Sequence, residues 1–195
     1  MSASNSVPNT PNSIRCSWAG SDPLYIKYHD EEWGKPIYDD KILFEFLILE
    51  GAQAGLSWIT ILHRRENYRK VFADFNVNEV AAFGDKDTER LMNDAGIIRN
   101  KLKINGAITN AKLFIEIQKE FGSFSNYLYK FMPTGKPIQT KIDKMSDIPA
   151  RTEISDAISK DMKKRGFKFF GTTICYAFMQ ATGMVNDHLI TCCAR

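Results

Sequence analysis

The sequence predicts an all-α protein. Apolar residues recur at helical spacing from residue 40 onward, the alternation typical of half-buried strands is nearly absent, and proline marks connections such as TGKPIQ and DIPAR. With 195 residues, 44% of them hydrophobic, the chain is long enough to bury a full core. We expect one helical domain over residues 15–195, preceded by a disordered tail over residues 1–14.

The first helical segment begins after residue 40, where Ile42, Phe46 and Leu49 repeat at intervals of three or four. A second segment carries Ile59 and Leu62 and continues into HRRENYRKVF. The same spacing predicts further helices over residues 78–84, 87–94, 101–121, 123–132, 153–165 and 172–182.

Three local features complete the expected fold. Gly166 follows the cationic run KKR, as expected of a glycine that ends a helix. Residues 135–151 are expected to form a long loop. Cys175 lies within the apolar stretch TTICYAFMQ and is expected in the core.

Charge and segment composition limit the setting of the protein. The 26 Lys and Arg against 23 Asp and Glu give a net charge of +3, with basic residues concentrated in HRRENYRK, RNKLK and KDMKKRGFK. This balance permits nucleic-acid binding without establishing it. The apolar runs fall far short of a membrane span, and the N-terminus lacks a secretory signal. We expect a cytoplasmic monomer with reduced thiols and no membrane contact.

Two pairs of residues could hold a metal ion. His188 and Cys192 are four residues apart, a spacing that places both on one face of a helical turn. Cys16 and His29 lie near the start of the expected domain, so all four would form a closed Cys2His2 site that joins the two ends of the chain. Such a site leaves no open coordination position, and its zinc would therefore be structural. Cys193 competes with Cys192 for the last position.

The stretch LMNDAGIIRNKLKI indicates a hairpin between two helices. Gly96 lies in the turn, and Arg99, Lys101 and Lys103 follow it. A glycine turn can bring backbone N–H groups close to a phosphate, and the N-terminus of the next helix favours negative charge. A helix-hairpin-helix of this kind binds the DNA backbone without reading base sequence, although an ordinary helical corner has the same pattern.

A carboxylate lies among aromatic residues in the first third of the chain. Glu50 ends an apolar helical run in LILEGAQAGLSW, where a buried charge needs a partner or a function. The aromatic residues are more often core than pocket in such a pattern. They are Trp18, Tyr25, Tyr28, Trp33 and Trp58.

Together these stretches resemble the 3-methyladenine DNA glycosylase I family of the helix-hairpin-helix superfamily. The resemblance rests on RCSWAGSDPLYIKYHDEEWG, LEGAQAGLSWITIL, ENYRKVF, DAGIIRNKLKI, KKRGFKFFGTTICYAFMQATG and VNDH, and runs from about residue 15 to the end. It implies a two-lobed helical enzyme that flips out N3-methyladenine from alkylated double-stranded DNA and excises it by hydrolysis. It also favours a monofunctional enzyme without a lyase step.

The resemblance implies roles for individual pocket residues. Glu50 and Tyr28 would hydrogen-bond the excised base, Trp58 would stack on it, and Tyr25 and Trp18 would help to line the pocket.

It also implies a structural metal and a DNA-inserting loop. Gly55 and Leu56 resemble the loop that fills the gap left by the flipped nucleotide. One structural zinc ion would join the ends of the chain. Its ligands would be Cys16, His29, His188 and Cys192.

Three other interpretations stay open at this point. A non-catalytic helix-hairpin-helix protein would explain the basic hairpin equally well, with Glu50 structural and the aromatic residues in the core. An enzyme of the same architecture could act on another alkylated purine. A catalytic zinc hydrolase is disfavoured, because four protein ligands leave no site for substrate.

Overall fold

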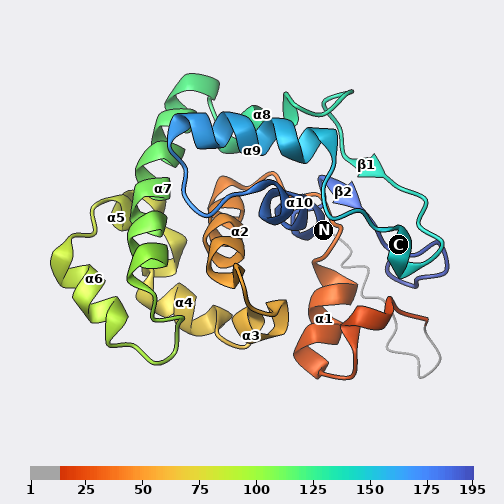
Figure 1. The fold of residues 1–195 in the computed structure, drawn as a ribbon, viewed down its shortest axis with the longest axis horizontal. Coiled ribbons are helices and arrows are strands. Elements are labelled where there is room, and N and C mark those ends of the chain that lie inside the picture. Colours follow the sequence, from red (N-terminus) through yellow and green to blue (C-terminus); the bar gives the residue numbers. More distant parts are fainter. Residues whose placement is uncertain (1–13) are drawn as a thin grey trace, which may run out of the picture.

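A computed structural model describes residues 14–195 and shows a predominantly helical molecule (Figure 1). Its helices are α1 (Pro23–Glu31), α2 (Asp40–Gln53), α3 (Trp58–Leu62), α4 (Arg65–Val71), α5 (Val77–Ala81), α6 (Asp85–Met92), α7 (Lys101–Phe121), α8 (Phe124–Tyr129), α9 (Glu153–Arg165) and α10 (Thr172–Ala181). Single 3-10 turns are η1 (Ser17–Ala19), η2 (Ala73–Phe75) and η3 (Met145–Asp147). The strands β1 (Ile138–Gln139) and β2 (Val185–Asn186) form a short parallel pair.

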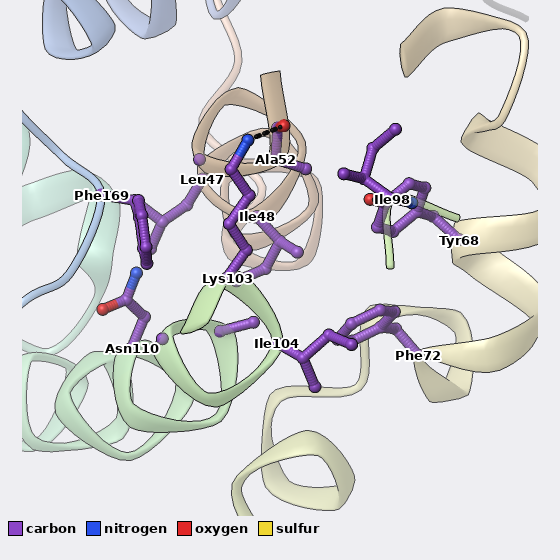
Figure 2. A pocket seen from close by; sticks show the side chains of 13 residues that line it. Leu47, Ile48, Ala52, Tyr68, Phe72, Ile98, Lys103, Ile104, Asn110 and Phe169 are labelled. Atoms are coloured by element: carbon purple, nitrogen blue, oxygen red, sulfur yellow. Dashed lines mark hydrogen bonds between the residues drawn. The ribbon is translucent and has the colours of Figure 1, made fainter. Parts of the chain in front are cut away.

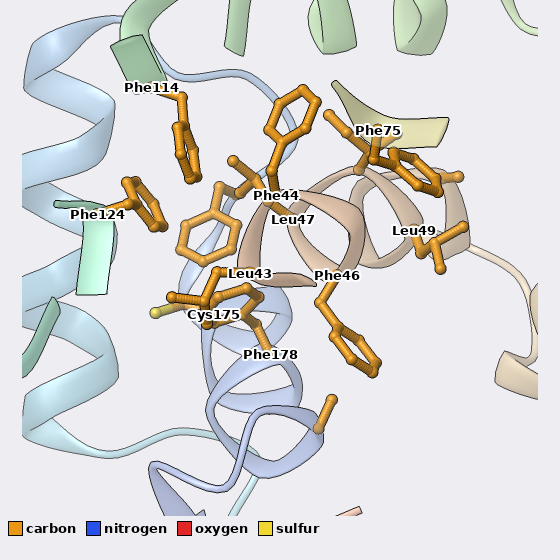
Figure 3. Close-up of a cluster of buried hydrophobic side chains, with 14 of the residues drawn as sticks. Leu43, Phe44, Phe46, Leu47, Leu49, Phe75, Phe114, Phe124, Cys175 and Phe178 are labelled. Atoms are coloured by element: carbon orange, nitrogen blue, oxygen red, sulfur yellow. The ribbon is translucent and has the colours of Figure 1, made fainter. Parts of the chain in front are cut away.

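Helix α2 is the centre of the core. Residues 43–52 of this helix are all buried, which explains why its sequence is apolar on every side. Figure 3 shows Phe44 between aromatic residues of other elements, with ring-centroid distances of 5.2 Å to Phe114 and 6.4 Å to Phe75. Phe178 and Cys175 of α10 pack in the same cluster, and the core position predicted for Cys175 is confirmed.

The remaining elements are arranged around α2 and α10. In Figure 1, α4–α7 lie on one side of this central pair, whereas α1, the two strands and the C-terminal turn lie on the other. Helices α8 and α9 run across the top of the view. Helix α2 thus lies between the two groups of elements and packs against both α7 and α10.

Several predicted boundaries agree with the structure. Helices α7 and α9 begin and end where the spacing places them, and α10 ends one residue earlier than predicted. Gly166 ends α9 in the left-handed conformation, with a φ of 104°, as the preceding cations indicate. The predicted loop over residues 135–151 holds β1 and η3 but no α-helix.

Helix α1 and the strand pair were not predicted from the sequence. Helix α1 has only a weak apolar repeat, but its start carries a recognisable signal, since Asp22 caps the amides of Leu24 and Tyr25 and Pro23 occupies the first helical position. Two-residue strands are too short to show alternation, so no sequence pattern could reveal them.

The start of the described chain lies beside its end. The carbonyl of Ile14 accepts a hydrogen bond from the amide of Cys193 at 2.9 Å, so Ile14 belongs to the folded part and not to the predicted tail. Residues 1–13, which make up the rest of that tail, lie outside the described residues. Across residues 14–195, no helix combines the length and the apolar character needed to cross a bilayer.

The packing around α2 predicts the effect of truncating its side chains. Replacing the fully buried Phe44 by alanine should lower the free energy of unfolding by about 3–5 kcal/mol, through lost contacts and a residual cavity. Ile42→Ala on the same helix is the matched control, because Ile42 is 38% exposed, and should cost less than about 1 kcal/mol. Urea unfolding measures both values, and equal losses would contradict this assignment of the core.

Candidate functional site

A pocket of about 180 Å³ opens between α1, the last turns of α2, the start of α3, η3 and α10. We call it the aromatic pocket. All six residues of the aromatic and carboxylate set singled out from the sequence meet here, namely Trp18, Tyr25, Tyr28, Trp33, Glu50 and Trp58. The structure thus brings together side chains from four separate segments of the chain.

Local structure explains how these side chains reach one cavity. Tyr25 and Tyr28 are three residues apart on α1, so both face the same side of that helix. Trp58 is the first residue of α3, and its ring lies 5.4 Å from the Tyr28 ring. Phe46, one turn before Glu50 on α2, stacks on Trp58 at 6.2 Å with an interplanar angle of 19°. The core therefore fixes the orientation of the pocket wall.

Within the described part of the chain, no positively charged side chain offsets the charge of the Glu50 carboxylate. Glu50 is 2% exposed, and its Oε2 atom has no hydrogen-bond partner among the described residues. Burial alone raises the pKa of this carboxyl to about 8. Glu50 is therefore mostly neutral at pH 7 in the empty pocket. A cationic ligand beside it would favour loss of its proton.

Two further groups in the pocket are available for hydrogen bonding. The indole Nε1 of Trp58 is buried without an acceptor among the described residues. Burial raises the pKa of the Tyr28 hydroxyl well above its ordinary value, so Tyr28 stays a hydrogen-bond donor at neutral pH. A buried unpaired polar atom costs about 1–3 kcal/mol, and proteins retain such atoms mainly where a ligand pairs with them.

The predicted metal ligands also come together. The ligand atoms of Cys16, His29, His188 and Cys192 lie within 4.8 Å of one another, and all four residues are buried. The Cys192 Sγ atom is 3.4 Å from His29 Nε2 and 3.4 Å from His188 Nδ1, and Cys16 Sγ is 3.6 Å from the same His188 atom. The cluster can hold a metal ion.

The outward nitrogen of each histidine is bound as a metal site requires. His29 Nδ1 lies 2.7 Å from the Asp30 carboxylate, which Arg15 holds through a second ion pair at 2.8 Å. His188 Nε2 lies 3.0 Å from the Trp33 carbonyl. These acceptors orient both rings so that the remaining nitrogens face the sulfur atoms, and His29 Nε2 also accepts a hydrogen bond from the Cys16 amide at 3.3 Å. A hydrogen bond from Cys16 lowers the pKa of the Cys192 thiol, which favours the thiolate that metals bind.

The local structure of the terminal pair differs from the prediction. His188 and Cys192 were expected on one helical turn, but the last helix ends at residue 181 and both ligands lie in the non-helical segment after β2. The Cys192 amide donates to the Leu189 carbonyl at 2.9 Å, which forms a tight turn that turns both side chains inward. Pairing of Leu189 with Ile142 fixes this turn to the long loop.

The predicted hairpin lies between α6 and α7. Gly96 permits close packing, because a Cβ there would lie 2.1 Å from the Asn67 side chain. Its own amide donates to Asp94 at 2.6 Å and is thus not free for a phosphate. The amides of Ile97 and Arg99 donate to no other described residue. Arg99 and Lys101 are exposed at this end of α7, whose first turn is capped by the Asn100 side chain.

The loop between α2 and α3 presents an apolar side chain to solvent. Gly55 has a φ of 81°, a value that favours glycine, and it allows the chain to turn sharply after α2. Leu56 follows it and is 42% exposed. Leu56 is thus an exposed apolar side chain in a tight turn, two residues before Trp58 of the aromatic pocket.

The chain matches the family model for methyladenine glycosylases over residues 18–195. The chain belongs to the methyladenine glycosylase family. It is 52% identical to DNA-3-methyladenine glycosylase 1 of Escherichia coli over 179 residues, which cover 92% of this chain and 95% of the relative. It is 45% identical to DNA-3-methyladenine glycosylase of Haemophilus influenzae over 180 residues, which cover 92% and 97%.

Solved structures of the same family share the fold. A 3-methyladenine DNA glycosylase I from Staphylococcus aureus, described for its recognition of 3-methyladenine, superposes with a TM-score of 0.89 at 37% identity and covers 92% of this chain and 95% of its own. A crystal structure of 3-methyladenine DNA glycosylase I gives a TM-score of 0.89 at 50% identity, with coverage of 92% and 98%. The predicted family and the helical fold are confirmed.

The pocket also includes residues to which the sequence analysis assigned no role. Gln53 and Gln180 supply polar atoms, and Met145 and Ile148 come from the long loop. Gln53 lies one helical turn after Glu50, a spacing that could have signalled its position. The other three are brought in by tertiary contacts that no local pattern records.

The buried carboxyl predicts a pH-dependent cost to stability. The folded-state pKa of Glu50, about 8, exceeds the ordinary value of 4.5, so its neutral form stabilises the fold below pH 4.5 and this contribution is lost as the pH rises through 8. Glu50→Gln should therefore be no less stable than the wild type near pH 5 and progressively more stable toward pH 8. The difference should grow by at most about 1.4 kcal/mol per pH unit.

Urea unfolding at several pH values measures this difference. Glu89→Gln, which removes an exposed carboxyl on α6, is the matched control and should give no such trend. A Glu50→Gln variant whose stability follows that of the wild type at every pH would show that Glu50 is not desolvated.

Proposed function

We propose that this protein hydrolyses the N-glycosidic bond of N3-methyladenine in alkylated double-stranded DNA. The observation that carries this proposal is the Glu50 carboxyl in a pocket of aromatic side chains, whose buried Oε2 atom has no hydrogen-bond partner in residues 14–195. Membership of the family supports it, because both relatives named above are DNA-3-methyladenine glycosylases. A base inside a duplex cannot reach such a pocket, so the nucleotide must first flip out of the helix.

The pocket suits an alkylated adenine better than normal bases. Methylation at N3 makes adenine cationic, and a cation on the face of the Trp58 ring gains about 0.5–2 kcal/mol that neutral adenine does not. An ionised Glu50 accepts a hydrogen bond from the exocyclic amine of adenine. Guanine presents a carbonyl oxygen at that position, which would face the carboxylate unfavourably. The positive charge of the bound base would offset the desolvation cost of ionised Glu50 and so favour loss of the Glu50 proton.

The chemical step needs little assistance, because the base leaves as a neutral molecule. Water attacks the sugar carbon and releases a proton to the solvent, and the electron pair of the broken glycosidic bond neutralises the ring. An interaction that stabilised the cationic base more than the transition state would slow this step, so Glu50 serves to position and select the base. Tyr28 would hydrogen-bond it as well. No lysine lines the pocket in residues 14–195, which supports a monofunctional enzyme without a Schiff-base intermediate.

The spacing of the ligand atoms in the Cys/His cluster fits a zinc ion. Bonds of about 2.3 Å to sulfur and about 2.0–2.1 Å to nitrogen in a tetrahedron place the two kinds of atom about 3.5 Å apart. The three measured sulfur–nitrogen distances are 3.4, 3.4 and 3.6 Å. Cys16, His29, His188 and Cys192 would hold the ion. Four protein ligands would make it structural, tying the C-terminal turn to α1 and leaving no coordination site for substrate.

DNA contacts would come from the hairpin and from the loop between α2 and α3 that carries Gly55 and Leu56. The amides of Ile97 and Arg99, which donate to no other described residue, would bind phosphate together with the exposed side chains of Arg99 and Lys101 at the start of α7. Leu56, which follows Gly55, would occupy the gap left by the flipped nucleotide and offset part of the unstacking cost. The monomeric state and the cytoplasmic location expected from the sequence stay predictions.

Chromatography of the bases released from methylated duplex DNA tests the activity. Wild-type protein should release 3-methyladenine without cutting the strand. Glu50→Gln keeps the shape but removes the charge-assisted hydrogen bond, worth about 1.5–3 kcal/mol, and should slow release by about 10- to 100-fold. Trp58→Ala should also slow release. Failure of the folded wild type to release any base would favour a non-catalytic DNA-binding protein, and release of a different alkylated purine alone would correct the substrate.

Metal analysis tests the zinc site. The purified protein should contain one zinc ion per chain, and Cys192→Ser should lower both the zinc content and the melting temperature. Cys193→Ser is the matched control, because the structure places the neighbouring Cys193 outside the ligand cluster, and it should keep the metal. A wild-type protein that lacks zinc and melts at the same temperature as Cys192→Ser would contradict the assignment.

A further inference from the structure

Lys103 differs from the other basic residues near the hairpin in where its ammonium group lies. Arg99 and Lys101 are exposed, whereas Lys103 crosses from α7 to the end of α2 (Figure 2). Its Nζ atom donates to the carbonyl oxygens of Ala52 at 2.8 Å and Ala54 at 2.7 Å. Among the described residues, Lys103 forms no ion pair with a carboxylate. Its charge is thus directed at the backbone of another helix.

These two carbonyls belong to a part of α2 that requires such a partner. The last carbonyl groups of an α-helix have no partner within the helix, and they carry the negative end of its dipole. Helix α2 ends at Gln53, so Ala52 and Ala54 lie on either side of its last residue. An ammonium group satisfies both acceptors at once and interacts favourably with the dipole. The cavity beneath Lys103 is only about 20 Å³, so no ligand larger than water competes for this position.

Lys103 therefore connects three parts of the molecule. It lies in the first turn of α7, where the Asn100 side chain accepts a hydrogen bond from its amide at 3.1 Å. Its side chain binds the end of the helix that carries Glu50. The second of its two acceptors, Ala54, is followed directly by Gly55 and by the exposed Leu56.

We propose that Lys103 is a positioning residue that sets the loop carrying Leu56 relative to the phosphate-binding hairpin. This inference rests on the proposed function. When the hairpin grips the DNA backbone, the bonds from Lys103 to Ala52 and Ala54 place Leu56 at a fixed distance along the duplex. Leu56 then enters the base stack next to the nucleotide that the aromatic pocket receives. Lys103 itself does not bind phosphate.

A duplex with an abasic-site analogue beside 2-aminopurine provides a stable probe. Insertion of Leu56 unstacks the 2-aminopurine and raises its fluorescence, while the salt dependence of binding counts phosphate contacts. Lys103→Met keeps the aliphatic stem and removes the ammonium group. It should bind the probe with an unchanged salt slope and bind free 3-methyladenine normally, but give a reduced fluorescence rise at saturation. Lys101→Met is the matched control, and it should lower the salt slope by about one and keep the full rise.

A double-mutant cycle with Leu56→Ala separates positioning from a general loss of stability. Lys103→Met should slow excision by about 10- to 100-fold in the wild-type background, as expected for a misplaced group, and have little effect when Leu56 is already alanine. If Lys103→Met does not fold, Lys103→Gln, which keeps a neutral donor, replaces it. A salt slope lowered by about one with a full fluorescence rise would overturn the proposal, as would equal effects in both backgrounds. Release of 3-methyladenine by the wild type tests the proposed function separately.

Discussion

Helix α2 is buried on all of its sides, and this constraint determines the character of the site. A carboxyl group on its last turns loses its water, and Glu50 receives no counter-charge in return. The resulting rise of its pKa to about 8 is a cost to the empty protein. On the proposed function, the same feature would make the pocket selective, because a cationic ligand with a donor at the correct position would offset the cost of ionising Glu50.

Helix α1 connects the aromatic pocket to the Cys/His cluster. Helix α1 carries Tyr25 and Tyr28 into the pocket and His29 into the metal cluster, so one short helix serves both sites. A helix of nine residues is marginal alone, and its position depends on tertiary contacts. Binding of a metal by the two ends of the chain would hold α1 against the core. A metal held in this way would act on the pocket through packing, without taking part in the reaction.

The sequence predicted the parts of this molecule that have local signals. Long amphipathic helices such as α7 and α9 were placed correctly because their apolar spacing and caps are strong. Six residues of the aromatic pocket and the four residues of the Cys/His cluster were also identified, since unusual residue types and the family resemblance both point to them. The helical turn predicted for His188 and Cys192 was wrong, because a spacing of four residues also occurs in tight turns.

Other features depend on contacts between distant segments and could not be predicted. The strands pair residues about 47 positions apart with only two residues each. Gln180 and Met145 reach the pocket through the packing of α10 and the long loop. Lys103 is one of the two lysines in the basic run RNKLK, and nothing in the run distinguishes it. Only the structure shows that its ammonium group binds the end of another helix instead of facing solvent.

The properties of this pocket depend on a Glu50 carboxyl that is desolvated and neutral at pH 7 when no base is bound. Carbon-13 NMR of labelled glutamate side chains, with Glu50→Gln used to assign the signal, measures its titration directly. We expect one carboxyl that titrates with a midpoint near pH 8 and is missing from the variant. A Glu50 midpoint close to 4.5 would show that water or a counter-charge already solvates this group, and that burial does not govern its ionisation.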